Sequence, residues 1–140
     1  PYLIKRLISH KKDIVGALAF KRRPPYEPCL LTKVEKNIYQ HMPVQDWAGK
    51  GLVPVDGIGM AATLIRTEVF KKVEQPWFLF TPQLAEDLYF SSKAQDAGFE
   101  IYCDTDLIAG HIGPNTIIDA ETFAEYLKNW AKSQENHEPK

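Results

Sequence analysis

A continuous apolar run near the start of the chain limits what this sequence can fold into. Residues 14–20 read Ile-Val-Gly-Ala-Leu-Ala-Phe, with no polar side chain and with β-branched residues at the beginning. A strand with one face in water alternates apolar and polar residues, so an unbroken run is typical of a strand that is covered on both faces. The Lys-Arg-Arg-Pro-Pro segment at residues 21–25 ends the run. We therefore expect an α/β fold.

Periodicity and capping residues place the remaining elements. An apolar face with helical spacing predicts an amphipathic helix over residues 1–12, and Gly and Pro mark residues 43–59 as a long loop. Thr81 at an N-cap and Pro82 at the first helical position predict a helix that Gly98 ends. The other expected elements are strands at residues 26–32, 38–42, 60–65 and 99–103, a short helix capped by Thr67, and a last helix capped by Asp119.

Length and charge exclude several classes of protein. The 140 residues suit one domain, which we place at residues 1–131, followed by a disordered polar tail at residues 132–140. With 17 basic and 18 acidic residues, no overall field recruits nucleic acid or an anionic membrane. No apolar run approaches the ~18 residues of a membrane span. Cys29 and Cys103 form neither a disulfide framework nor a metal pattern, so we expect reduced thiols in a cytoplasmic protein.

The strongest candidate for a site is an acidic pair followed by a histidine. Glu86 and Asp87 lie in a predicted helix, a strand follows, and His111 comes just after that strand. This order brings a carboxylate and an imidazole to one end of a sheet, where open α/β folds bind their ligands. Each residue also has a structural explanation, because the helix dipole favours acids in a first turn and a lone histidine is commonly a satisfied core or turn residue.

Four segments in order carry a family resemblance over residues 3–114. The segments are Lys12–Gly16 with Arg22–Tyr26, Asp56–Met60 leading to Ile65–Phe70, Glu86–Leu88, and His111–Gly113. Together they resemble the C-terminal, acceptor-side half of the family 2 glycosyltransferases, enzymes of the GT-A fold that move a sugar from a nucleotide-sugar to an acceptor hydroxyl. The resemblance implies a partial GT-A, Rossmann-like mixed sheet flanked by helices.

The resemblance also implies roles for individual residues. Asp87 would be the base that takes the proton of the acceptor hydroxyl, and Glu86 would orient the acceptor. His111 would join a divalent cation, Mn²⁺ or Mg²⁺, and Asp56 and Gly57 would line the donor or acceptor pocket. Two further expectations come from residue type: Arg22 and Arg23 can meet a pyrophosphate, and Trp47 can stack on a sugar ring, although solvated arginines and core aromatics are common.

The family's N-terminal half, with the nucleotide-binding strands and the metal-binding Asp-x-Asp motif, has no counterpart in this sequence. Asp104-Thr105-Asp106 has the same spelling but follows the acidic pair, so we expect turn residues there. We therefore expect a fragment, a truncated inactive form, or a chain that another chain completes. A half-sheet exposes an edge, and pairing of that edge with a second copy would give a homodimer.

The expected function is transfer of a sugar from a UDP- or GDP-sugar to a hydroxyl acceptor. The alternative is a non-catalytic remnant that binds carbohydrate or a protein through the loop at residues 43–59. A metal-dependent hydrolase built on Glu86, Asp87 and His111 ranks last, since further metal ligands are lacking. The donor sugar, the acceptor and the stereochemistry of transfer stay open.

Overall fold

The apolar run at residues 14–20 forms β1 (Ile14–Leu18), the strand on which the rest of the molecule is built. All five of its residues are buried. Ile14 and Leu18 lie in the larger core cluster with Phe90 of α4 (Glu86–Asp96), whereas Val15 and Ala17 lie in a smaller cluster with Leu7 of α1 (Tyr2–Ser9). Because successive side chains point to opposite faces, burial on both sides requires apolar residues at every position.

The structure is a computed structural model that describes residues 2–113 and 116–135. Its helices are α1 (Tyr2–Ser9), α2 (Val44–Trp47), α3 (Thr67–Lys72), α4 (Glu86–Asp96) and α5 (Ala120–Glu135). Besides β1, its strands are β2 (Leu30–Glu35), β3 (Ile38–His41), β4 (Leu52–Val55), β5 (Gly57–Ile58), β6 (Thr63–Ile65), β7 (Ile101–Ile108), β8 (His111–Ile112) and β9 (Ile117–Ile118).

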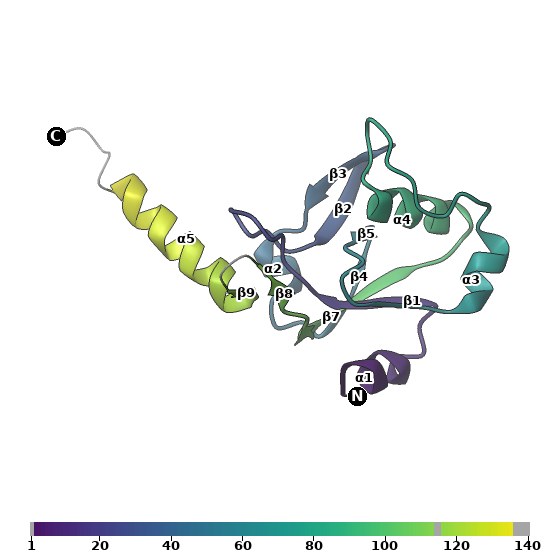
Figure 1. The fold of residues 1–140 in the computed structure, drawn as a ribbon, viewed down its shortest axis with the longest axis horizontal. Helices are drawn as coiled ribbons and strands as arrows, with labels where there is room; N and C mark the ends of the chain where they lie inside the picture. Colours follow the sequence, from purple (N-terminus) through teal and green to yellow (C-terminus); the bar gives the residue numbers. More distant parts are fainter. Residues whose placement is uncertain (1, 114–115, 136–140) are drawn as a thin grey trace.

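The main sheet has the order β4-β7-β1-β6, in which β1 and β7 are parallel and the outer pairs are antiparallel. A second sheet has the order β3-β2-β5, and β8 and β9 form a hairpin. Helix α1 lies on one side of β1 and α4 on the other, while α5 projects away from the body (Figure 1). The architecture is mixed α/β with a mixed sheet flanked by helices, which confirms the predicted fold class.

The segment at residues 43–59 is not a long loop, contrary to expectation. It contains α2, β4 and β5. Val53 and Val55 are buried, whereas Pro54 between them is exposed. Proline is tolerated in β4 because this strand is an edge of the sheet, with β7 on one side only. The glycines that suggested a loop serve a tight turn, since Gly49 and Gly51 have φ of 68° and 67°.

Three other local predictions were wrong. Thr67 does not cap α3, because it is the first residue of that helix and Arg66 is the N-cap. Thr81 does not cap α4, because its hydroxyl accepts a hydrogen bond from the Leu84 N–H at 2.9 Å and so closes a separate turn ahead of the helix. Asp104 and Asp106 are not turn residues but belong to β7. The expected end of α4 is confirmed, since Gly98 has φ of 87° and its N–H donates to the Gln95 carbonyl at 2.8 Å.

The predicted start of the last helix is also confirmed. The Asp119 carboxylate accepts hydrogen bonds from the N–H groups of Glu121 at 3.0 Å and Thr122 at 3.1 Å. Helix α5 continues to Glu135, so the first part of the expected polar tail is helical, and residues 136–140 lie outside the described residues. In the part of the chain that the structure describes, no helix has the length and apolarity needed to cross a membrane.

Candidate functional site

Asp87 lies in the first turn of α4, where its side chain is half-buried. One carboxylate oxygen, Oδ1, accepts the Leu88 N–H at 2.8 Å. Burial raises the pKa of Asp87 above its ordinary value, and the neighbouring Glu86 carboxylate adds to the rise. Within residues 2–113 and 116–135, no basic side chain forms an ion pair with Asp87. The group is therefore a partly desolvated carboxylate with an uncommitted second oxygen.

The backbone of Gly59 leaves room beside this carboxylate. A Cβ atom at position 59 would lie 4.0 Å from Asp87 Oδ2 and 2.8 Å from the Cβ of Cys29, closer than carbon atoms pack. The Gly59 N–H donates to the Cys29 carbonyl at 3.0 Å, and the Cys29 N–H donates to the Ala19 carbonyl at 2.8 Å. This ladder fixes Cys29 between the end of β1 and the start of α4.

The Cys29 thiol lies near both acidic and basic side chains. The pKa of its thiol is raised to about 11, mainly by burial; the Asp87 and Glu27 carboxylates also raise it, and Lys21 lowers it. The thiol is therefore protonated at neutral pH and is no nucleophile in this state. The Gly59 contact puts Asp87 on one side of Cys29, and the hydrogen bond from Cys29 to Ala19 puts the base of the loop that begins at Lys21 on the other.

That loop presents the basic side chains expected to meet a pyrophosphate. Lys21, Arg22 and Arg23 are exposed and, with Ile112 of β8, line an open hollow of about 580 Å³. The Lys21 N–H donates to the Glu27 carbonyl at 2.9 Å, so the loop is a closed turn. An exposed group of cations on a fixed turn can bind an anion of the size of a diphosphate.

His111 is attached to the base of the same loop. Its Nδ1 donates to the Phe20 carbonyl at 2.9 Å, which leaves Nε2 as the atom able to bind a metal ion. Among the described residues, no group of three or more His, Cys, Asp or Glu side chains gathers in a way that would hold an ion. His111 thus fits as one ligand, and the described residues do not complete a site around it.

Two predicted site residues, Asp56 and Gly57, have structural roles. The Asp56 carboxylate accepts the Lys33 N–H at 2.8 Å and the Gln95 side-chain amide at 2.8 Å. Gln95 lies about 12 Å along α4 from Asp87, at 1.5 Å per residue, so Asp56 serves the opposite end of that helix. Gly57 allows β5 to approach α4, because a Cβ there would lie 2.4 Å from Cδ2 of Leu88.

Trp47 contradicts the expectation that it stacks on a sugar. Its side chain is 7% exposed, and its ring meets that of Phe20 edge-on at a centroid distance of 6.5 Å. The indole is therefore part of the core. The segment at residues 43–59, which the non-catalytic alternative used as a binding loop, is folded into α2, β4 and β5.

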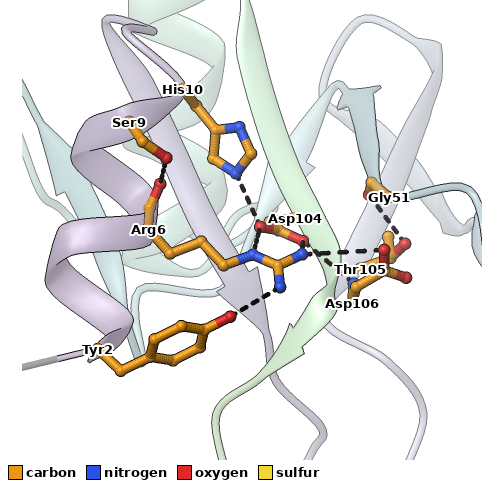
Figure 2. Close-up of polar contacts among 8 residues, drawn as sticks. All are labelled: Tyr2, Arg6, Ser9, His10, Gly51, Asp104, Thr105 and Asp106. Carbon is orange, nitrogen blue, oxygen red and sulfur yellow. Dashed lines mark hydrogen bonds and ion pairs between the residues drawn. The ribbon is translucent and has the colours of Figure 1, made fainter.

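An ion pair between the partly exposed Arg6 and the buried Asp104 joins the first helix to β7 (Figure 2). Arg6 donates to both carboxylate oxygens of Asp104, at 2.5 Å and 2.8 Å, and His10 Nε2 lies 2.7 Å from Oδ2. Burial raises the pKa of Asp104, but the hydrogen bonds from Arg6 and His10 outweigh it, so the net pKa is lowered. These partners leave Asp104 no free oxygen for a metal ion. Sequence reasoning missed the cluster because nothing local links residues 98 positions apart.

Comparisons with known proteins support the fold and do not identify a function. No protein-family model matches the sequence, and no curated protein matches it. Nine chains of known structure match; one is the crystal structure of A197 from STIV, a viral protein. The identity is 21% and the TM-score 0.50, over 83% of this chain and 56% of that one. The chain therefore spans little more than half the length of A197, and what the two proteins share is an α/β fold with a mixed sheet flanked by helices.

Proposed function

We propose that this chain is the acceptor-side part of a glycosyltransferase of the GT-A type, which moves a sugar from a UDP- or GDP-sugar to an acceptor hydroxyl. One observation supports it most: Asp87, a half-buried carboxylate without a cationic partner among the described residues, lies beside Gly59 and Cys29, and the backbone of Cys29 is bonded to Ala19, two residues before a loop with three exposed cations. A base and an anion-binding group on one region of a sheet are what sugar transfer requires.

In the proposed reaction, the acceptor hydroxyl lies against Asp87 Oδ2. Asp87 takes the hydroxyl proton as the oxygen forms a bond to the anomeric carbon, and the bond from that carbon to the phosphate oxygen breaks. The electron pair of the broken bond leaves with the nucleoside diphosphate, whose charge Arg22 and Arg23 would offset. The raised pKa of Asp87 makes its carboxylate a stronger base than that of a solvated aspartate.

Glu86 is proposed to orient the acceptor. It is adjacent to Asp87 in the first turn of α4, and successive helical residues point about 100° apart, so both carboxylates cannot address the same proton. A divalent cation, Mn²⁺ or Mg²⁺, would supply further neutralisation of the leaving diphosphate, and Nε2 of His111 is the atom that would hold it. The free thiols of Cys29 and Cys103 favour a reducing compartment, and we propose the cytoplasm.

Calorimetric titration tests the proposal. We expect UDP, GDP or one of their sugar conjugates to bind the native chain, more tightly with Mn²⁺ present, and binding to weaken in His111→Ala and in Arg22→Ala/Arg23→Ala. Asp87→Asn should bind the donor as the native chain does and lose turnover by about 10² or more. Lys71→Met is the control for binding, because Lys71 lies on α3 and pairs with Glu68. Absence of binding by the folded chain would contradict a donor site in this chain.

A further inference from the structure

Lys21, Glu27 and His41 form a compact polar cluster at the base of the basic loop. The Lys21 ammonium lies 2.8 Å from Glu27 Oε2 and 2.8 Å from His41 Nε2. The last two atoms are 3.0 Å apart. His41 is the final residue of β3, so the cluster ties the loop to the second sheet.

The hydrogen bond at Nδ1 of His41 determines which nitrogen of the imidazole carries the proton. His41 Nδ1 lies 2.9 Å from the Pro28 carbonyl oxygen, which can only accept, so Nδ1 carries the proton. In the neutral ring, Nε2 then carries a lone pair that accepts a hydrogen bond from the Lys21 ammonium. A lone pair and a carboxylate oxygen at 3.0 Å repel each other unless a donor lies between them, and the Lys21 ammonium is that donor.

This arrangement leaves one N–H bond of Lys21 unassigned. An ammonium has three donors, and Glu27 and His41 take two. Lys21 also lines the hollow with Arg22 and Arg23. The same side chain is therefore restrained from one side and open to the hollow on the other.

We propose that Lys21 is a third cationic ligand for the diphosphate and that Glu27 and His41 are positioning residues that hold it toward the hollow. The inference rests on the proposed function and names how its anion site is organised. Restraint matters because a free lysine loses rotamer entropy when it binds, whereas a lysine already held by two acceptors loses less. Glu27 has a second effect: its charge offsets the repulsion among the three cations when no anion is bound.

Binding of inorganic pyrophosphate to the native chain, measured by calorimetry, is the test. Lys21→Met should weaken binding about 10-fold, as for a lost hydrogen bond between charged groups. His41→Leu should weaken it about 3-fold, while His41→Gln, whose amide oxygen can still accept from Lys21, should stay within about 2-fold of the native chain. Lys71→Met, which breaks a comparable lysine–glutamate pair on α3, should have no effect.

Nitrogen NMR supplies a readout that a packing role would not move. We expect His41 with its proton on Nδ1 at neutral pH, and a slowly exchanging Lys21 ammonium signal that His41→Leu removes and His41→Gln keeps. Equal weakening in both His41 variants, native-like binding in Lys21→Met, or no pyrophosphate binding at all would overturn the inference. Pyrophosphate binding that depends on Lys21, with no nucleotide-sugar bound, would instead count against the transferase and leave the anion site standing.

Discussion

Asp87 combines a functional requirement with a cost to stability at the level of a single residue. Burial raises its folded-state pKa above the unfolded value, so its contribution to stability is present at low pH and is lost as the pH rises through the folded pKa. At neutral pH the ionised carboxylate is therefore held in a site that disfavours it. Such a penalty is usual where a carboxylate must act as a base.

Asp87→Asn should separate these two effects. The amide keeps an oxygen to accept the Leu88 N–H and removes the buried charge, so we expect Tm at pH 7 to rise by up to about 3 °C while turnover is lost. Scanning calorimetry should show the gain shrinking as the pH is lowered toward 4. Glu86→Gln is the control, because the adjacent residue shares the helix turn. A lower Tm for Asp87→Asn at pH 7 would show that the charge has a stabilising partner.

Gly16 is the residue most tightly constrained by its neighbours in β1. A Cβ there would lie 2.4 Å from Cδ1 of Ile58 and 2.8 Å from Oγ1 of Thr63. We expect Gly16→Ala to lower the free energy of unfolding by about 2 kcal/mol, measured by urea denaturation. Ile58→Val removes the closer atom, so the double variant should recover part of the loss. Strictly additive losses would place the clash elsewhere.

At the scale of elements, the ion pair between α1 and β7 is the contact with the largest expected effect. Asp104 is fully buried, so Asp104→Asn would leave Arg6 with only the exposed Asp106 carboxylate, 3.8 Å away, as counter-charge, and we expect Tm to fall by about 5 °C. Asp106→Asn, at the exposed end of the same network, should change Tm by about 1 °C. A similar fall of Tm in both variants would show that it comes from a change in the strand β7 and not from the loss of the ion pair.

The same pair predicts a pH dependence. The folded-state pKa of Asp104 is lowered, so its contribution is complete above the unfolded value of about 3.9 and is lost as the pH falls through the folded value. The Tm difference between the native chain and Asp104→Asn should therefore be constant at neutral pH and shrink below about pH 4. A difference that persists there would indicate that Asp104 acts by packing alone.

Elements with a strong local signal could be predicted from the sequence, and those defined by distant partners could not. The unbroken apolar run predicts β1. Gly98 ends α4 through its positive φ, and the Asp119 carboxylate caps the start of α5. Asp104 was predicted in a turn from its position after the acidic pair, and Arg6 and His10, from the other end of the chain, compensate its burial in a strand. Trp47 is undecidable locally, since an indole serves a core and a sugar site equally well.

The candidate site followed the same division. Asp87, Arg22, Arg23 and His111 stand out by residue type and order. In the structure, His111 and the arginine loop meet just after β1, and Asp87 lies beside Gly59 and Cys29. Cys29, Gly59 and His41 carry no signal of their own. Their positions depend on pairing of β2 with β5 and β3, which the sequence does not specify.

At the scale of the whole molecule, the two edges of the main sheet differ. Pro54 has no N–H and lies on the β4 edge, which blunts that edge against pairing. On the β6 edge, the Ala62 carbonyl and the Arg66 N–H form hydrogen bonds on the side of β1. Because backbone groups alternate in direction along a strand, those of Thr63 and Ile65 face away from β1, toward the outside of the sheet. The β6 edge is therefore the one we expect to accept another strand.

We predict that two copies pair through β6 to form a dimer. Light scattering at increasing concentration should show a doubled mass, and Ile65→Pro, which removes an outward N–H, should give a monomer. Retained secondary structure by circular dichroism must accompany that result, because Ile65 also contacts the core. A native chain that stays monomeric at high concentration would count against this pairing.

The central place of β1 has a consequence for how the chain reaches its fold. Ile14 pairs with Ile65 and with Ile101, so the most apolar strand leaves the ribosome long before its partners exist. The ion pair between Arg6 and Asp104 cannot form until Asp104, 98 positions later, has been synthesised. Contacts this distant in sequence slow folding and expose apolar segments to aggregation in the meantime. During synthesis, residues 14–20 would thus be the segment most in need of a chaperone.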